Sequence, residues 1–539
     1  MYRKLAYLGA MAAMVVPLSW LALPRTVDDA GGELAQLRDE FDLGQADLGE
    51  IDPASETMKL ATLGLRGVAV NLLWQRANEL KKTENWSELT ATLDQLAKLQ
   101  PNFVTFWKFQ AWNQSYNLSV EFDDYRDRYY YVRRGIEFME KGERYNRDNP
   151  QLLWELGWFI GYKIGRADEK VQYRRLFKAD DEYHKTRPLN QRDNWLVGKQ
   201  WYEQAVVAAD DRGRGIGRKS PIVFYQQPAK WQMNYAAAIE DEGVFENAVE
   251  QWRVAEGEWR DFGARELQHS FGDKIQLNSS ARLAEEIVEL QQQLDALNPE
   301  SEANLTAKLR ETLTDEERAA IQKDPADWTE AEGTLAFDAR IKLKVRPRQL
   351  AEQIGLDKPG LRREAQRIAA ALEDASRRLR YTDSYKDTAN YDYWLTRTEF
   401  EQTAAALEAR ELIFRADEAF TKDLMPEAAK PLYEQGFAKW REVLDAFPVL
   451  LDVDGTTGDD IFVHILDYHR VLEQLEEEIA DDFPLWDIIR DFDAEADLRA
   501  ELSAYEQRMR EKSGAEADPA AADQPGGGPR PPTGAGPAG

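Results

Sequence analysis

The sequence predicts an all-α protein that is built mainly from packed pairs of helices. Two observations carry this prediction. Small and aromatic residues recur at fixed intervals over much of the chain, and the charged middle segment keeps apolar residues three and four positions apart, which is the period of one helix face. With 43% hydrophobic and 11% aromatic residues among 539, the chain can also bury a large core.

The composition narrows the class of function. The balance of 98 acidic against 69 basic residues gives a formal charge of −29, which disfavours nucleic acid as a partner. The absence of cysteine excludes disulfides, thiolate metal sites and a lipidated cysteine. These features favour a protein without enzymatic activity and without a cofactor. The chain has only four histidines, which leaves little material for an acid–base or metal site that uses imidazole. They are His184, His269, His464 and His469.

The amino-terminal residues predict a membrane anchor. Arg3 and Lys4, in a cytoplasmic segment of residues 1–4, precede an uncharged stretch at residues 5–24. At about 1.5 Å per residue this stretch reaches roughly 30 Å, the hydrocarbon thickness of a bilayer. A cleaved signal peptide stays the alternative. Because positive charge remains inside, we expect a single-pass protein of a bacterial inner membrane, with its bulk on the periplasmic side and a polar stalk at residues 25–58.

Recurring intervals in residues 59–273 and 388–450 predict stacked helix pairs. In residues 77–101 the marked positions stand 9, 3, 4, 3 and 5 apart; residues 236–255 repeat the first four intervals, and residues 433–448 repeat the last four. A small residue lets two helices approach closely, and an aromatic residue fills the space beside it. The positions are Ala77, Trp86, Leu89, Leu93, Leu96 and Pro101; Ala236, Phe245, Ala248, Trp252 and Ala255; and Tyr433, Gly436, Trp440, Val443 and Pro448.

This pattern resembles the tetratricopeptide repeat (TPR), a helix–turn–helix unit of about 34 residues with small residues at the helix crossings. A fourth copy spans residues 107–142 and contains the nine extra residues FDDYRDRYY, and a fifth opens at Leu153, Gly157 and Ile160. The resemblance implies a TPR-like α-solenoid, in which stacked pairs create a concave binding face.

The whole chain also resembles a family of large, membrane-anchored bacterial proteins of unknown function. The resemblance rests on the segments SETMKLATLGLRGVAVNLLWQRANELKKTENW and QRDNWLVGKQW. Members of that family sometimes carry the label "iron-responsive element" protein. No residue of this chain supports that label, so the resemblance implies no activity.

Residues 274–387 predict a helical insertion. Aromatic residues become rare there, and two charged stretches keep apolar residues at helical spacing, which predicts an antiparallel coiled-coil arm. Between them we expect a small helical tip with one extended stretch at residues 341–345. The apolar positions are Leu283, Ile287, Leu290 and Leu294 in the first stretch, and Ile368, Leu372 and Leu379 in the second.

The carboxy-terminal part predicts two different structures. Residues 451–512 begin with a loop and continue as helices. Residues 513–539 consist largely of Ala, Gly, Pro and Asp, which cannot bury enough apolar surface to fold, so we expect a disordered tail.

The strongest candidate for a binding site is the basic loop DRGRGIGRKSP, residues 211–221. Its spacing is one residue short of a phosphate-binding loop, and no strand precedes it. Two interpretations of this loop stay open. It contacts an acidic protein or a lipid headgroup, or it is a plain solvated loop. The candidate binding residues are the basic Arg212, Arg214, Arg218 and Lys219, together with the neighbouring aromatic Trp195, Trp201 and Tyr202 as a surface patch.

No metal site is predicted. His464 and His469 stand five apart, with Asp467 between them, and a helix would turn the two rings to different faces. Acidic groups at residues 121–127 and 452–460 could hold calcium, but the second group lacks the spaced oxygen ligands and the terminal glutamate of an EF-hand loop. Solvated or helix-capping charge is the simpler interpretation of both groups.

The sequence therefore predicts a scaffold that binds another protein along a TPR-like groove. A self-associating structural protein of the envelope is one alternative, and homo-oligomerisation through the arm stays open. An enzyme with its site in residues 211–228 or in the insertion is the other alternative.

Overall fold

The computed structural model describes Gly32, Glu33, Gln36 and residues 66–269, 272–354, 358–451 and 456–513. The predicted anchor at residues 5–24, most of the predicted stalk, and the predicted tail after Ser513 lie outside the described residues. Among the helices that are described, none combines the length and the apolar character needed to cross a membrane.

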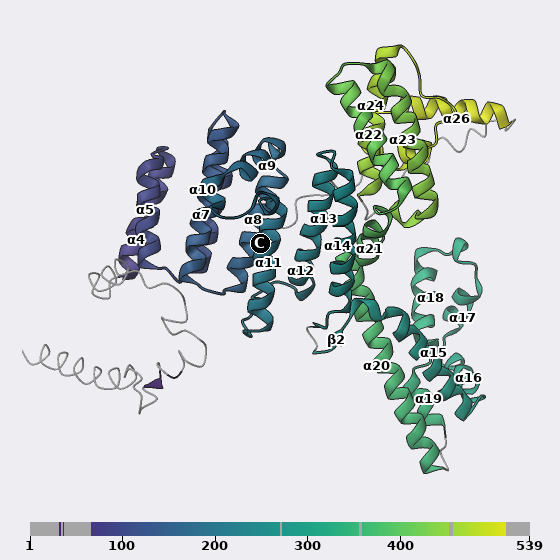
Figure 1. The fold of residues 1–539 in the computed structure, drawn as a ribbon. Helices are drawn as coiled ribbons and strands as arrows, with labels where there is room; N and C mark the ends of the chain where they lie inside the picture. Colours follow the sequence, from purple (N-terminus) through teal and green to yellow (C-terminus); the bar gives the residue numbers. More distant parts are fainter. Residues whose placement is uncertain are drawn as a thin grey trace, which may run out of the picture. The chain divides into compact units, whose positions relative to one another are not determined.

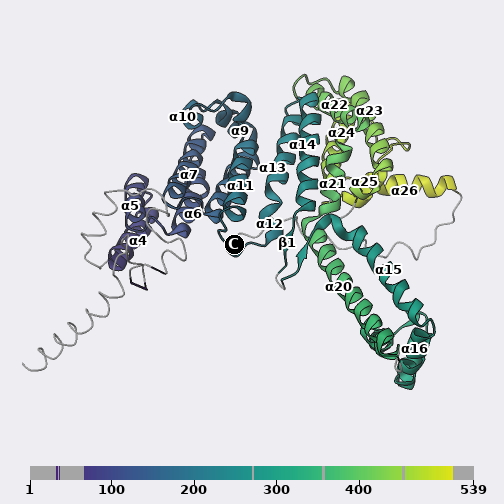
Figure 2. The same ribbon diagram turned by 60° about the horizontal axis from the view of Figure 1, so that its bottom comes forward.

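The all-α prediction is confirmed for the described residues, which contain only one pair of two-residue strands. The described residues form two compact units: residues 66–220 with 230–235, and residues 221–229 with 236–513. The division falls inside the segment 59–273 that the intervals predict as one array. Within the first unit, both ribbon views show the helices standing side by side (Figures 1 and 2).

The first unit consists of helices joined by short loops. Its elements are α4 (Arg66–Lys82), α5 (Trp86–Leu99), α6 (Val104–Trp112), the π-helix η1 (Asn113–Leu118), the 3₁₀ turn η2 (Ser119–Glu121), α7 (Tyr125–Tyr145), α8 (Pro150–Gly165), α9 (Lys170–Ala179), α10 (Asp181–His184), the 3₁₀ turn η3 (Leu189–Gln191) and α11 (Asn194–Asp210).

Side-chain caps set the starts of several of these helices. Asn85 accepts a hydrogen bond from the Glu88 amide at the start of α5, and Asp124 accepts one from the Arg126 amide at the start of α7. Each cap satisfies a backbone N–H that has no partner within the helix. Because Asp124 begins α7 inside the segment FDDYRDRYY, most of those nine extra residues lengthen the helix.

Small residues at the repeat positions lie where helices cross. Trp107 of α6 is fully buried, and its indole N–H donates to the Pro101 carbonyl at 2.7 Å. Gly142 of α7 faces this ring, and a Cβ there would lie 2.5 Å from Trp107 Cγ. In the same way α8 and α11 meet at Gly157 and Gly198, where a Cβ on Gly198 would lie 2.7 Å from the Gly157 carbonyl oxygen. The spacing therefore predicted close helix contacts correctly.

The second unit contains the remaining elements. They are α12 (Pro221–Tyr225), α13 (Gln227–Glu240), α14 (Phe245–Ala264), β1 (Leu267–Gln268), β2 (Lys274–Ile275), η4 (Leu277–Ser279), α15 (Ser280–Leu297), α16 (Ser301–Glu311), α17 (Asp315–Gln322), η5 (Pro325–Asp327), α18 (Glu330–Leu343), α19 (Pro347–Gln353), α20 (Pro359–Ala389), α21 (Tyr391–Phe400), α22 (Ala404–Thr421), α23 (Pro426–Ala446), η6 (Pro448–Leu451), α24 (Thr457–Leu475), α25 (Trp486–Phe492) and α26 (Arg499–Ser513). Residues 230–235 of α13 are counted with the first unit.

Two features of the second unit differ from the sequence expectations. The stretch 341–345 is not an extended segment, because α18 continues to Leu343. The strands β1 and β2 pair antiparallel, with Leu267 opposite Ile275, and no periodic signal predicted so short a hairpin. The long helices α15 and α20 do lie against each other (Figure 2), and their contact buries Leu294, Ile368 and Leu372.

Candidate functional site

Four aromatic side chains of the first unit form a stacked row along α6, η1 and α8. Trp112 stacks on Tyr116 with ring centroids 5.7 Å apart, Tyr116 on Trp158 at 6.4 Å, and Trp158 on Tyr162 at 5.3 Å. The interplanar angles of these three pairs are 18°, 20° and 17°. Trp112 and Tyr162, at the two ends, are 42% and 40% exposed. We call Trp112, Tyr116, Trp158 and Tyr162 the aromatic row.

Helix geometry explains why these rings line up. Trp158 and Tyr162 stand four apart on α8 and therefore share a face. Tyr116 lies in the π-helix η1, whose wider turn buries Ser115 against α7. Ser115 donates to the Val132 carbonyl at 3.1 Å, and the neighbouring Gly135 has no side chain to collide with it. Short π-helical turns are rare and are frequent at functional sites.

The row also carries positive charge. Lys163 Nζ lies 4.2 Å above the centre of the Tyr116 ring, a cation–π contact. Burial lowers the pKa of Lys163, and burial raises the pKa of Tyr116 to about 12, so the phenol stays neutral at physiological pH. A further exposed ring, Phe109, lies 6.0 Å from Trp74 of α4. Phe109 adds apolar surface beside the row, whereas the cation of Lys163 is buried against Tyr116.

The basic loop folds back onto α8, and one of its cations reaches the face that carries the row. Lys219 Nζ lies 3.4 Å above the Trp154 ring and 3.2 Å from Glu155 Oε1. Lys108 of α6 binds the same carboxylate at 2.8 Å. Glu155 stands three residues before Trp158 and seven before Tyr162, and so lies on the same face of α8.

The four basic residues of the loop have different surroundings. Arg212 pairs with Asp148, and Lys219 is held as described above, with burial lowering its pKa. Arg214 and Arg218 form no ion pair with any residue that the structure describes. The two unpaired guanidinium groups are therefore available to an anionic partner.

The prediction that an aromatic patch is exposed beside this loop is wrong. Trp195 and Tyr202 are only 2% and 1% exposed, and Trp201 is half-buried against the core of the first unit. Trp195 and Tyr202 both contact Trp231 edge to face, at 5.4 and 4.9 Å. The residues that sequence reasoning missed are those of the aromatic row. Their four-residue spacing, 112 to 116 and 158 to 162, was the available signal.

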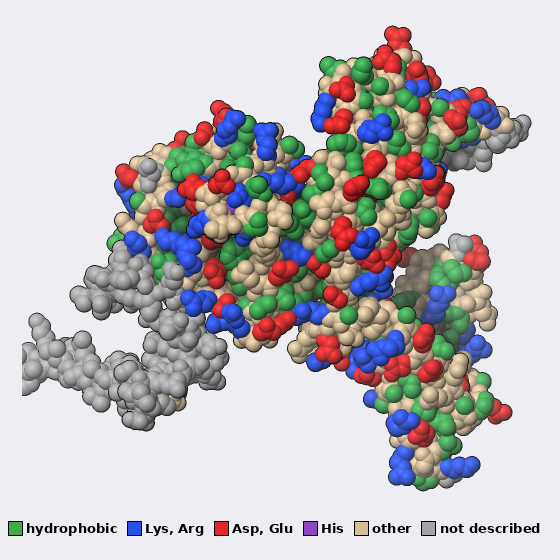
Figure 3. All heavy atoms as spheres, viewed as in Figure 1, with side chains coloured by type: hydrophobic (Ala, Val, Ile, Leu, Met, Phe, Trp, Pro, Cys, Tyr) green, Lys and Arg blue, Asp and Glu red, His purple; other side chains and the backbone are tan. Residues whose placement is uncertain are grey.

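The first unit differs from the whole chain in charge. Residues 66–220 and 230–235 contain 28 Lys and Arg against 22 Asp and Glu, a net charge of +6, whereas the whole chain carries −29. Acidic and basic side chains are interspersed on the face drawn in Figure 3. The basic balance of this unit makes an acidic partner segment electrostatically favourable there.

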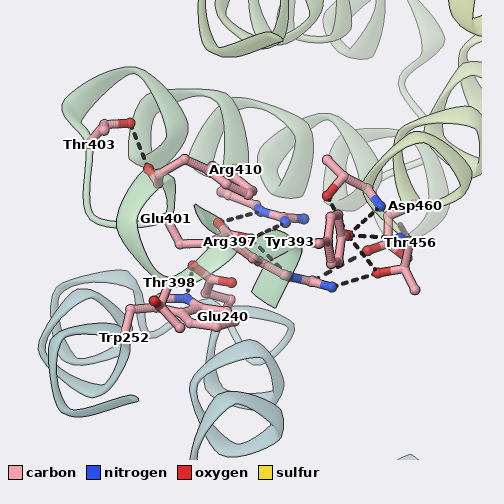
Figure 4. A network of polar contacts seen from close by, with 12 residues as sticks. Glu240, Trp252, Tyr393, Arg397, Thr398, Glu401, Thr403, Arg410, Thr456 and Asp460 are labelled. Atoms are coloured by element: carbon pink, nitrogen blue, oxygen red, sulfur yellow. Dashed lines mark hydrogen bonds and ion pairs between the residues drawn. The ribbon is translucent and has the colours of Figure 1, made fainter. Parts of the chain in front are cut away.

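The second unit contains a buried network of charged groups (Figure 4). Glu401, whose side chain is fully buried, accepts hydrogen bonds from Arg410 at 2.6 and 3.3 Å and lies 3.6 Å from Arg397. Arg397 also donates to Thr456 at 2.7 Å and to Asp460 at 3.3 Å. Helices α21, α22 and α24 are thereby linked through polar contacts.

A second carboxyl group faces this network from α13. Glu240 accepts a hydrogen bond from the Trp252 indole of α14 at 3.0 Å, and Figure 4 shows both side chains pointing toward the arginines. Burial and then the Glu401 carboxylate raise the pKa of Glu240 to about 8. Burial alone would lower the pKa of Arg410, but the carboxylates of Glu401 and Glu240 raise it above its usual value. Asp460, at the edge of the network, is 43% exposed, whereas the side chain of Glu401 at its centre is fully buried.

A cleft of about 530 Å³ lies among α14, η4, α15, α20 and α21 of the second unit. Its cations are engaged: Lys386 pairs with Asp392 at 2.8 Å, and Arg260 pairs with Glu256 and Glu399. The lining includes no histidine. The cleft therefore presents apolar surface and paired charges.

Comparisons with known proteins found no match: no model of a protein family, no curated protein and no solved structure is similar to this chain.

Proposed function

We propose that the protein is a membrane-anchored scaffold without enzymatic activity, whose first unit binds an acidic, extended segment of another protein along the aromatic row. The observation that carries this proposal is the exposed, stacked row itself. Exposed aromatic side chains are enriched at the centres of protein interfaces, because they bury a large area while few rotatable bonds are fixed. The net charge of +6 on the unit favours an acidic segment.

The location of the row supports a TPR-like solenoid. Its residues lie on α6 with η1 and on α8, and the neighbouring Phe109–Trp74 contact extends to α4. These are the first helices of successive pairs, α4 with α5, α6 with α7 and α8 with α11. Stacked helix pairs bind partners along a face that equivalent helices line. Arg214 and Arg218 would lie near carboxylates of the bound segment.

Photocrosslinking tests the proposal in native membranes. A photoreactive phenylalanine analogue at position 112 or 162 reports on the row, and one at position 130 is the control, because Tyr130 is exposed to a similar degree, 47%, on α7. We expect one protein to crosslink at positions 112 and 162 only, and the crosslinked peptide to be acidic. Equal crosslinking at all three positions, or a basic peptide, would contradict the proposal.

Substitution then measures the energy of the contact. Trp112→Ala with Tyr162→Ala should weaken binding of the identified segment by at least about 30-fold, because an interfacial aromatic residue contributes about 2 kcal/mol or more. Tyr130→Ala should leave the affinity unchanged. Both targets are exposed, so folding is preserved, and circular dichroism checks this.

A second candidate function is self-association through a coiled-coil arm formed by α15 and α20. It is favoured by exposed apolar side chains in this part of the chain: Val288 on α15 is 55% exposed, and Phe337 and Ile341, four apart on α18, are 64% and 53% exposed. Measurement of the mass in solution tests it. A dimer that Phe337→Ser with Ile341→Ser dissociates would favour the structural role, and a monomer would exclude it.

A further inference from the structure

Three possible metal ligands meet on the surface of the second unit. Asp417 comes from α22, and His464 and Asp467 come from adjacent turns of α24. One donor atom of each residue lies within 4.8 Å of the donor atoms of the other two. A metal ion bound at about 2.0–2.2 Å from nitrogen and oxygen needs its donors about 3.3 Å apart. Small side-chain rotations would therefore bring these three groups around one ion.

The imidazole of His464 is oriented toward this cluster. Its Nδ1 lies 3.5 Å from Asp417 Oδ2, the spacing that two ligands of one ion would have. The same Nδ1 is buried and makes no hydrogen bond within the described residues. A buried nitrogen without a hydrogen bond costs free energy, and coordination of a cation would remove that cost.

Each carboxylate is held by a neighbour through one oxygen only. Tyr433 of α23 donates to Asp417 Oδ1 at 2.5 Å, and Arg470 donates to Asp467 Oδ1 at 2.6 Å. The second oxygen of each carboxylate is left for the cluster. Metal ligands in proteins are commonly oriented by hydrogen bonds of this kind from outside the first coordination shell.

We propose that Asp417, His464 and Asp467 bind a divalent first-row transition-metal ion such as Zn²⁺. One imidazole and two carboxylates form a mixed nitrogen and oxygen donor set, which such ions accept. When the imidazole is neutral, the negative charges of the two carboxylates exceed the single positive charge of Arg470. A bound divalent cation would reverse this local excess of negative charge. The side chains are 33%, 27% and 27% exposed, so water has access to complete the coordination.

The assignment differs from the pair that the sequence draws attention to. His469 lies 3.2 Å from Glu501 and takes no part in the cluster. The sequence spacing of His464 and His469 argued against a joint site of these two residues, and it did not point to Asp417, which comes from another helix. No local motif contains it.

Zinc binding to the full-length protein tests the proposal. Zn²⁺ is titrated by calorimetry at an ionic strength that screens the acidic surface, with His464→Asn, Asp417→Asn and the control His469→Asn. We expect one tight site per chain that His464→Asn and Asp417→Asn each weaken at least tenfold and that His469→Asn leaves unchanged. Tyr433→Phe removes an outer hydrogen bond and should weaken binding about 10- to 100-fold.

Two outcomes would overturn the assignment: no tight site in the unaltered protein, or a site that survives His464→Asn. Circular dichroism of each variant separates loss of the site from loss of the fold. If Asp417→Asn does not fold, the comparison of His464→Asn with His469→Asn decides alone, because both side chains are partly exposed on the same helix.

Discussion

Replacement of Glu401 by Gln should destabilise the second unit more than any surface ion pair can. The side chain of Glu401 is fully buried and lies between Arg397, which is 11% exposed, and Arg410, which is 18% exposed. Glutamine keeps the shape and one acceptor oxygen but removes the negative charge. Two guanidinium groups then remain in a buried site with the support of Asp460, which is 43% exposed, and of Glu240, whose pKa burial still raises.

The magnitude follows from this burial. Removal of one partner of a buried ion pair costs about 3–5 kcal/mol, because the remaining charge has lost both water and its partner. Glu399→Gln makes the same chemical change two residues earlier, where Glu399 is 37% and its partner Arg260 is 54% exposed. That exposed pair is screened by solvent and should cost only about 0.2–1 kcal/mol.

Hydrogen exchange of the full-length protein, read by mass spectrometry for peptides that cover α21 and α22, measures both changes. A loss of 3–5 kcal/mol corresponds to exchange that is roughly a hundred- to several-thousand-fold faster, at about 1.36 kcal/mol per factor of ten. Glu399→Gln should accelerate exchange by about fivefold at most. If the two variants exchange within twofold of each other, the buried network does not carry the stability assigned to it.

Two further predictions concern neighbouring features. Because the pKa of Glu240 is raised to about 8 in the folded state from an ordinary value of 4.5, the folded state holds this proton more tightly; stability is therefore fully present below pH 4.5 and declines as pH rises through 8. Glu240→Gln should remove this dependence, so thermal unfolding at pH 6 and pH 9 should differ less in the variant than in the unaltered protein. Gly142→Ala should destabilise the first unit by about 1–3 kcal/mol in urea unfolding, since its Cβ would overlap Trp107. The helical control Gly257→Ala, with no atom within 4 Å of its Cβ, should stabilise by about 0.5–1 kcal/mol.

The helix pairs could be predicted from the sequence because their contacts are local. Ala77, Trp107 and Trp252 are buried at crossings between helices that are adjacent in the chain, so a fixed spacing reports them. The exposure of Trp195 and Tyr202 could not be predicted in this way. Both side chains are covered in part by Trp231, which comes from a later segment of the chain and contacts each of them edge to face.

In the candidate sites too, spacing within one helix could be read from the sequence, whereas contacts between distant helices could not. The two halves of the aromatic row each follow a four-residue spacing, but only the fold brings Tyr116 beside Trp158. The cluster around His464 depends on Asp417, which precedes it by 47 residues and lies on a helix with no recognisable ligand motif. Side chains that meet between helices far apart in the chain leave no periodic signal.

The buried charges of the second unit also affect which helices can pair. Apolar helix surfaces tolerate many alignments, and a protein made of several similar pairs risks joining the wrong ones during folding. A slide of one helical turn would shift α24 by about 5.4 Å along its neighbours and would carry Asp460 out of reach of Arg397. Such a misaligned intermediate would hold unpaired charge in an apolar contact and would reopen. The polar contacts of the network are therefore satisfied only when these helices stand in the alignment of the folded structure.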